Sequence, residues 1–231
     1  MRRGITLLEV LISTVILSVV LGMILSLLVQ TSKLYAKTSP YLTGQSADML
    51  ALKRMQRELR DAMLISTTSP SPSTWVEIVL PKKDVAGMNV IQADALGNLS
   101  LATGSTIDYF LGTKIAQSTS DPTLWSAQAS DQGTTLFRAD HASQTSASPA
   151  RWSQATIMVD GVVNPAAVAT VTSLSTLSQK TLFAYTPSDG SGNPTALTQL
   201  ISIAVIVQGT YQGRPVYTPL STQFCMRNLK S

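Results

Sequence analysis

Few residues in this 231-residue chain could carry out acid–base, nucleophilic or metal chemistry. His141 is the only histidine, and it lies in a polar stretch with no motif for a catalytic triad nearby. The sequence contains no HExxH motif, no CxxC pair, no phosphate-binding glycine loop with a lysine and no dinucleotide fingerprint. We therefore expect no catalytic residue, no metal ligand and no cofactor, and we do not predict an enzyme.

Cys225 is the only cysteine, which excludes an intramolecular disulfide in any redox compartment. A reactive thiol needs exposure and a basic neighbour, and Arg227 is the only nearby candidate in the sequence. We expect Cys225 to be a small buried hydrophobic residue.

Aspartates are the remaining candidate ligands. Loop carboxylates could bind calcium, but these residues do not have the spacing of a calcium loop, and solvated turns are the favoured interpretation. The aspartates concerned are Asp84, Asp94, Asp108, Asp121, Asp131, Asp140 and Asp160.

The most unusual charged residue is Glu9, which interrupts an otherwise apolar segment from Ile5 to Val29. As a helix rising about 1.5 Å per residue, this segment would extend roughly 37 Å, enough to cross a bilayer core with some tilt. A carboxylate there costs on the order of a few kcal/mol unless it stays hydrated near the interface or meets a cation. For an isolated glutamate, both interpretations are open.

Basic residues before the apolar segment set its expected orientation. Arg2 and Arg3 favour a cytoplasmic N-terminus, so the chain after Gln30 should lie on the other side of the membrane. A secretory signal peptide is the alternative, but the apolar stretch is longer than usual and Leu34-Tyr35-Ala36 is a poor cleavage site. We expect a single-pass membrane protein.

The run Gly4-Ile5-Thr6-Leu7-Leu8-Glu9-Val10 resembles the processing site of type IV prepilins and type II secretion pseudopilins. The resemblance rests on about the first thirty residues: a basic leader, a glycine, a glutamate at fixed spacing and an unbroken apolar helix. In that family a membrane peptidase cuts after the glycine and methylates the new amino terminus. The resemblance implies that the leader 1–4 is removed after Gly4, that Ile5 is methylated, and that Glu9 acts in assembly. The leader is very short, and Ile5 replaces the commoner phenylalanine or methionine.

The same resemblance implies the partners, which are the prepilin peptidase, other minor and major pilins or pseudopilins, and the inner membrane. In a filament the Glu9 carboxylate could be compensated by the freed ammonium group of Ile5 in a neighbouring subunit, so that charge selects the register.

After the anchor we expect a helical stem over residues 30–66 that breaks near Pro40. Helical periodicity returns from Gln45 to Ser66, with an apolar stripe opposite a charged, solvated face on which Arg54 and Glu58 are spaced to pair. The stripe, which should pack on a sheet, consists of Met49, Leu52, Met55, Leu59, Ala62 and Met63.

Residues 67–231 should form one β-rich domain, because short β-forming runs alternate with Ser, Thr, Gly and Pro. The fold class is thus α+β and pilin-like, with a long N-terminal helix on a mainly antiparallel sheet. We expect surface loops over Ser118–Ser130 and Ala142–Ser153, and a hairpin connection over Ser188–Pro194. The expected strands are Trp75–Leu80, Thr106–Leu111, Thr135–Arg138, Thr156–Val163, Thr181–Tyr185, Leu200–Gln208 and Thr222–Arg227.

Looser motifs over most of the chain are similar to the J-type minor pseudopilins and W-type minor pilins. They include the helix end Leu52–Ala62, the Asp160-Gly161-Val162 run and the closing segment Phe224–Asn228. This similarity implies a minor subunit that initiates or caps a type IV pilus-like or type II secretion filament, located in the inner membrane and at the filament tip.

The charge composition of the chain excludes some possible functions and leaves one alternative open. The net charge of +4 comes from bases spread among acids, so we expect no direct contact with nucleic acid. A membrane-tethered ectodomain with ligand-binding or enzymatic activity is the alternative to a filament subunit, since an anchor and a fold do not fix function.

Overall fold

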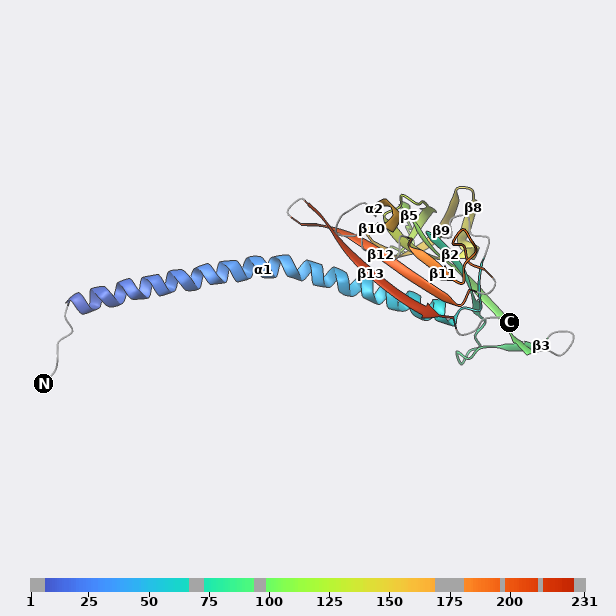
Figure 1. The fold of residues 1–231 in the computed structure, drawn as a ribbon, viewed down its shortest axis with the longest axis horizontal. Helices are drawn as coiled ribbons and strands as arrows, with labels where there is room; N and C mark the ends of the chain where they lie inside the picture. The colour runs from blue at the N-terminus through green and yellow to red at the C-terminus, as the bar shows by residue number, and fades with distance from the viewer. Residues whose placement is uncertain are drawn as a thin grey trace. The chain divides into compact units, whose positions relative to one another are not determined.

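The computed structural model describes residues 7–66, 73–93, 99–168, 181–195, 198–211 and 214–226, and all side chains within them except those of residues 36–47, 167, 210, 211, 214 and 216. The chain divides into two compact units, Met1–Ala47 and Asp48–Ser231. Helix α1 (Leu7–Asp61) contributes its first part to one unit and its end to the other (Figure 1).

From Leu7 to Val29 helix α1 exposes apolar side chains along its length. A span of 29 residues, Leu7–Tyr35, is long and apolar enough to cross a membrane, and none of its most apolar window is covered by protein. Leucine, isoleucine and valine side chains from Leu7 to Val29 are at least 46% exposed. The predicted N-terminal apolar helix is therefore confirmed, and it continues past Val29.

The predicted break near Pro40 is wrong at the level of secondary structure, because α1 is continuous from Leu7 to Asp61. A proline removes one backbone N–H donor and crowds one carbonyl group. The other hydrogen bonds of a long helix hold the turns on both sides, so a helix can run through such a position. The stem also ends earlier than residue 66, since β1 (Leu64–Ile65) follows Asp61 closely.

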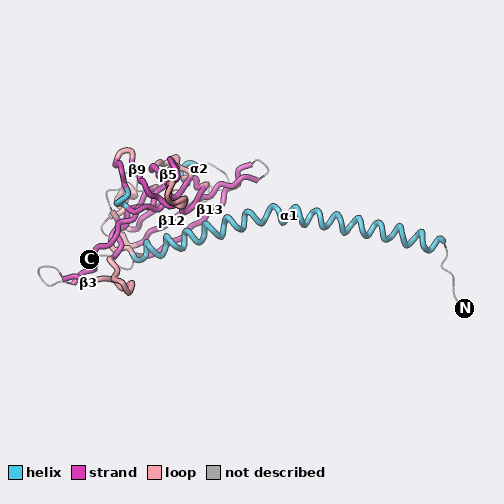
Figure 2. Tube along the Cα trace, turned by 180° about the vertical axis from the view of Figure 1, so that it is seen from behind, coloured by secondary structure: helices cyan, strands magenta, loops and turns pink. Residues whose placement is uncertain are grey.

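In the second unit the end of α1 lies along the strands (Figure 2). Leu52, Met55 and Leu59 form the buried stripe that the 3.6-residue periodicity predicts, whereas Met49 is 48% exposed. The stripe belongs to the main hydrophobic core, which takes side chains from both larger sheets, including Ile78, Ile107, Leu111, Leu136, Ile201, Ile203 and Val205.

The larger sheet has seven antiparallel strands, and four of them close into a ring. Strand β5 pairs with β6, β6 with β9, β9 with β7, and β7 again with β5. Every ring strand contributes buried side chains to a second core, among them Phe110, Ala127, Phe137 and Ala155. The strands of this sheet are β1, β2 (Trp75–Pro81), β5 (Thr103–Gln117), β6 (Leu124–Ala129), β7 (Thr135–Asp140), β8 (Gln144–Ala147) and β9 (Ala150–Asp160).

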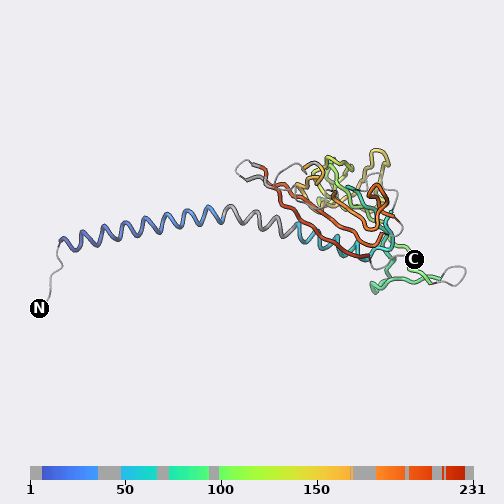
Figure 3. The backbone as a smooth tube through the Cα atoms, viewed as in Figure 1, coloured from blue at the N-terminus to red at the C-terminus, as the bar shows by residue number. Residues whose placement is uncertain are grey.

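A four-stranded sheet is built around β12 (Leu200–Tyr211). Strands β10 (Val162–Val163) and β11 (Phe183–Thr186) pair with β12, and β13 (Arg214–Cys225) runs beside it over its whole length (Figure 3). Residues 201–206 are all buried, so the predicted strand is covered on both faces. Ser188–Pro194 connects β11 to β12 as a hairpin, as predicted.

Four short elements complete the described secondary structure. A separate two-stranded sheet pairs β3 (Ile91–Ala93) with β4 (Leu99–Leu101). The 3₁₀ helix η1 (His141–Ser143) follows β7, and α2 (Pro165–Val168) follows β10.

The two predicted surface loops are wrong in part. Strand β6 lies within Ser118–Ser130, and β8 and the start of β9 lie within Ala142–Ser153. These segments are rich in alanine, serine and glutamine, which are not strong strand formers. Tertiary pairing decides their conformation, and Ala127 of β6 is fully buried.

The expectation of a buried Cys225 is also wrong, because its side chain is exposed. Side chains of a strand alternate between the two faces of a sheet. On β13 Phe224 faces the core and the next residue, Cys225, therefore faces solvent.

Candidate functional site

The processing motif is only partly described by the structure. Glu9 lies in the described part of the chain, whereas Gly4 and Ile5 lie outside it. Glu9 lies in the first turn of α1, on a segment where protein covers no side chain. An anion at the start of a helix is favoured by the helix dipole.

Hydroxyl groups follow Glu9 along the apolar helix and bond to their own helix. The Ser13 hydroxyl donates to the carbonyl of Glu9 at 2.8 Å, and the Thr14 hydroxyl donates to the carbonyl of Leu11 at 2.9 Å. Such bonds satisfy the hydroxyl groups without a partner helix. Between Leu7 and Val29, Glu9 is thus the residue that brings a formal charge to the apolar helix.

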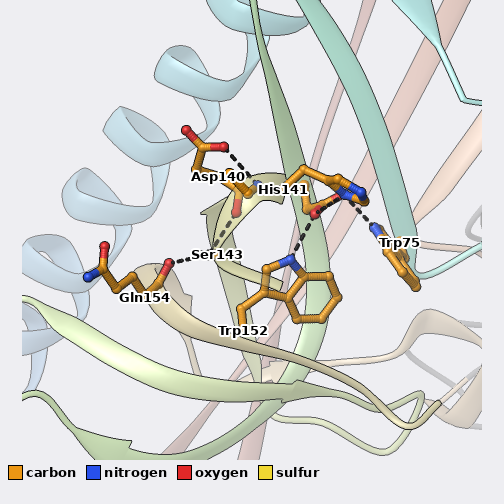
Figure 4. Close-up of polar contacts among 8 residues, drawn as sticks. Trp75, Asp140, His141, Ser143, Trp152 and Gln154 are labelled. Carbon is orange, nitrogen blue, oxygen red and sulfur yellow. Dashed lines mark hydrogen bonds and ion pairs between the residues drawn. The ribbon is translucent and has the colours of Figure 1, made fainter. Parts of the chain in front are cut away.

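A second polar site lies next to the core of the strand ring, around Asp108 on β5. This carboxylate is fully buried and accepts two indole hydrogen bonds, from Trp75 at 3.1 Å and from Trp152 at 2.8 Å. The Nδ1 atom of His141 lies 3.0 Å from the same carboxylate. Figure 4 shows both indoles and the imidazole converging at this point.

Glu77 places another carboxylate beside Asp108. The two residues are direct partners in the register of the antiparallel strands β2 and β5. Like charges directly opposite each other repel, and burial is the main cause that raises the pKa of Glu77, with the Asp108 charge adding to it against the opposing effect of His141.

A third site joins the end of α1 to the strand ring. The Glu58 carboxylate accepts a hydrogen bond from the Tyr109 hydroxyl at 2.6 Å and pairs with Arg138 at 2.9 Å. The expected pair of Arg54 with Glu58 also forms, at 3.3 Å. Glu58 is therefore not a solvated residue of the helix face, because its side chain is only 15% exposed.

Electrostatics at Glu58 favour the charged carboxylate. Burial opposes its ionisation most strongly, but the hydrogen bonds from Tyr109 and Arg138 and the charge of Arg138 together hold the pKa of Glu58 below its ordinary value. Burial, together with the neighbouring Glu58 charge, raises the pKa of Tyr109, so its hydroxyl stays protonated and donates.

Three of the seven aspartates act as turn residues. The carboxylates of Asp84, Asp121 and Asp140 accept backbone N–H groups two residues ahead, the arrangement of an Asx turn. Three others have different surroundings: Asp108 is buried, Asp131 accepts a hydrogen bond from the Thr74 hydroxyl, and Asp160 pairs with Lys114. Asp94 lies outside the described residues.

Residues 1–25 match the family model for the prokaryotic N-terminal methylation motif. The matched stretch contains Gly4, Ile5 and Glu9, so it supports a type IV pilin-like protein and implies processing by a prepilin peptidase. The apolar helix near the N-terminus fits the membrane anchor of such proteins. No curated protein and no solved structure gave a significant match to this chain.

Proposed function

We propose that this chain is a minor pilin or pseudopilin, a structural and non-catalytic subunit that initiates or caps a type IV pilus-like or type II secretion filament. The observation that carries the proposal is the methylation motif over residues 1–25, which leads directly into an apolar helix with a carboxylate in its first turn.

Assembly of helices explains the exposed apolar surface. In the described residues from Leu7 to Tyr35 no side chain is covered by protein, so lipid surrounds this part of the subunit before assembly. In a filament, sister helices would replace the lipid. The Glu9 carboxylate would then meet the amino terminus of Ile5 from a neighbouring subunit, which lowers the cost of placing a charge in apolar surroundings.

A minor role is supported by the size and build of the second unit. In the described residues, Asp48–Ser231 contains three sheets and two large hydrophobic clusters. The similarity of its helix end and closing strand to J-type minor pseudopilins and W-type minor pilins points in the same direction. The subunit would lie in the inner membrane with its N-terminus in the cytoplasm and its domain outside, and would enter the filament at the tip.

Cleavage is the direct test. The full chain would be expressed with and without a prepilin peptidase, and its intact mass and N-terminal sequence measured. We expect the wild-type protein to begin at a methylated Ile5 only when the peptidase is present, and Gly4→Ala to retain residues 1–4.

Gly22→Ala is a matched control for this test. An added Cβ at Gly22 meets no atom within 4 Å, so the variant should be processed like the wild type. A wild-type chain that stays uncut while another prepilin in the same cells is cut would contradict the proposal. A domain with ligand-binding or enzymatic activity that is indifferent to loss of Glu9 would favour the tethered ectodomain instead.

A further inference from the structure

Three side chains of the ligand type meet at one end of the strand ring, from three different elements. Glu77 comes from β2, Asp108 from β5 and His141 from η1, and one ligand atom from each lies within 4.8 Å of the other two. Residues so far apart in sequence converge only in the folded domain. The cluster mixes an imidazole with two carboxylates, so it differs from the acidic turns elsewhere on the surface.

The two carboxylates are held together by the sheet itself. Glu77 and Asp108 face each other in the β2–β5 register, and Asp108 is fully buried. Two anions on neighbouring strands destabilise a sheet unless a positive charge lies between them. Arg138 on β7 and Lys114 on β5 already pair with Glu58 and Asp160.

The indoles fix one ligand in place. Trp75 bonds one oxygen of Asp108 and Trp152 bonds the other, and the two rings also contact each other edge to face at 5.1 Å between centroids. Each carboxylate oxygen has two lone pairs, so both oxygens keep acceptor capacity after these bonds. This arrangement is that of a ligand oriented by outer hydrogen bonds, as in protein metal sites.

We propose that Glu77, Asp108 and His141 bind one zinc ion. An imidazole nitrogen and two carboxylate oxygens are common zinc ligands, whereas magnesium and calcium prefer oxygen atoms alone. The ion supplies the positive charge that the carboxylate pair needs. It replaces the contact between His141 and Asp108 and joins β2, β5 and η1 at the end of the ring.

Binding requires the three side chains to move closer together. Zinc ligands lie about 2.0–2.2 Å from the metal in a tetrahedral arrangement, so two ligand atoms are roughly 3.4 Å apart. The ligand atoms of Glu77, Asp108 and His141 lie within 4.8 Å of one another, so the widest separation must shrink by at most about 1.4 Å. Glu77 and His141 are both partly exposed, so their side chains can move and water can complete the coordination.

The test uses the full chain in detergent after removal of metals with a chelator. Zinc chloride is titrated by calorimetry, and the thermal midpoint of the domain is followed by circular dichroism. Cobalt(II) serves as a spectroscopic probe, because three-ligand sites with nitrogen and oxygen donors give visible absorption. We expect one ion per chain, saturable binding and a zinc-dependent rise of the thermal midpoint.

Two variants remove ligands, and one serves as the control. Glu77→Gln keeps the shape of a partly exposed side chain and should weaken zinc binding at least tenfold, as should His141→Ala. Asp121→Asn changes an exposed carboxylate in the turn between β5 and β6, and it should bind zinc like the wild type.

Circular dichroism without metal shows whether each variant is folded, and Glu77→Gln decides the question if His141→Ala does not fold. No zinc binding by the wild-type chain at millimolar concentration would overturn the proposal. Binding that Glu77→Gln leaves unchanged would also overturn it, because the ion would then be held elsewhere.

Discussion

The Glu58 carboxylate on α1 lies 2.9 Å from the Nε atom of Arg138 on β7, although the two residues are 80 positions apart in the sequence. Their side chains are only 15% and 21% exposed, so water screens this pair less than an ordinary surface pair. With the hydrogen bond from Tyr109, the pair connects the helix end to the strand ring by direct polar contacts.

Replacing the Glu58 carboxylate should lower the stability of the domain. Glu58→Gln removes the charge that Arg138 and Tyr109 meet, and leaves a half-buried guanidinium without its anion, so the free energy of unfolding should fall by about 1–3 kcal/mol. Urea denaturation of the full chain in detergent measures the loss, since urea adds no screening salt. Arg57→Gln, an exposed change one residue away, should cost less than about 0.5 kcal/mol. Equal losses in the two variants would show that the pair contributes nothing.

Low pH should remove the contribution of Glu58 to the free energy of unfolding. The pKa of this carboxyl is lower in the folded domain than its ordinary value, so the folded state binds fewer protons than the unfolded state as the pH falls. The stability that Glu58 adds is thus fully present above the pKa of the unfolded chain, about 4.3, and is lost as the pH falls through the lower folded pKa. The difference in unfolding free energy between wild type and Glu58→Gln should be constant from pH 6 to 7 and shrink progressively below about pH 4.3. A difference that grows in acid would reverse the assigned sign.

The anchor and the amphipathic helix end could be predicted from local pattern alone. An unbroken apolar run and a repeat of buried positions at Leu52, Met55 and Leu59 depend only on residues near one another in the sequence. The long strand β12 could be predicted in the same way, because its apolar run is bounded by turn residues. The burial of Glu58 could not be predicted from local pattern. Its spacing to Arg54 is local, but its burial depends on Tyr109 and Arg138 in distant strands.

The strand ring and the Asp108 site could not be predicted from the sequence. Strand β6 consists largely of residues with weak strand preference, and it forms because β5 and β9 pair with it. Asp108 and His141 are 33 positions apart and carry no motif spacing. Only the register of β2, β5 and β7 brings Glu77, Asp108 and His141 together.

Closure of the ring should be sensitive to a single methyl group at Gly112. This residue pairs with Ala129 of β6 and with Thr135 of β7, so β5 meets both ring neighbours there. A Cβ at Gly112 would lie 2.4 Å from the backbone carbonyl oxygen of Gln128, which cannot rotate away. Gly112→Ala should therefore destabilise the domain by roughly 1–3 kcal/mol, as overpacking of a core does, and lower its thermal midpoint.

Gly190→Ala provides the comparison for the ring. A Cβ at Gly190 meets no atom within 4 Å, in the hairpin connection between β11 and β12. The thermal midpoint of Gly190→Ala should remain near that of the wild type. If Gly112→Ala and Gly190→Ala had the same thermal midpoint, the close approach at Gly112 would not determine the stability of the ring.

Assembly should depend on the charge of Glu9 and not on the Ser13 hydroxyl one turn further along the helix. Glu9→Gln keeps the size of the side chain but removes the anion that would meet a neighbouring Ile5 amino terminus, so co-assembly with sister subunits should fall at least tenfold while membrane insertion stays intact. Ser13→Ala removes a hydroxyl one turn further along, which bonds only to its own helix at the Glu9 carbonyl, and it should assemble like the wild type. Membrane fractionation checks insertion, and cross-linking to co-expressed major subunits measures assembly. If Glu9→Gln entered filaments at the wild-type level while its leader was still removed, charge pairing could not be what sets the register, and the apolar helix would have to do so by shape alone.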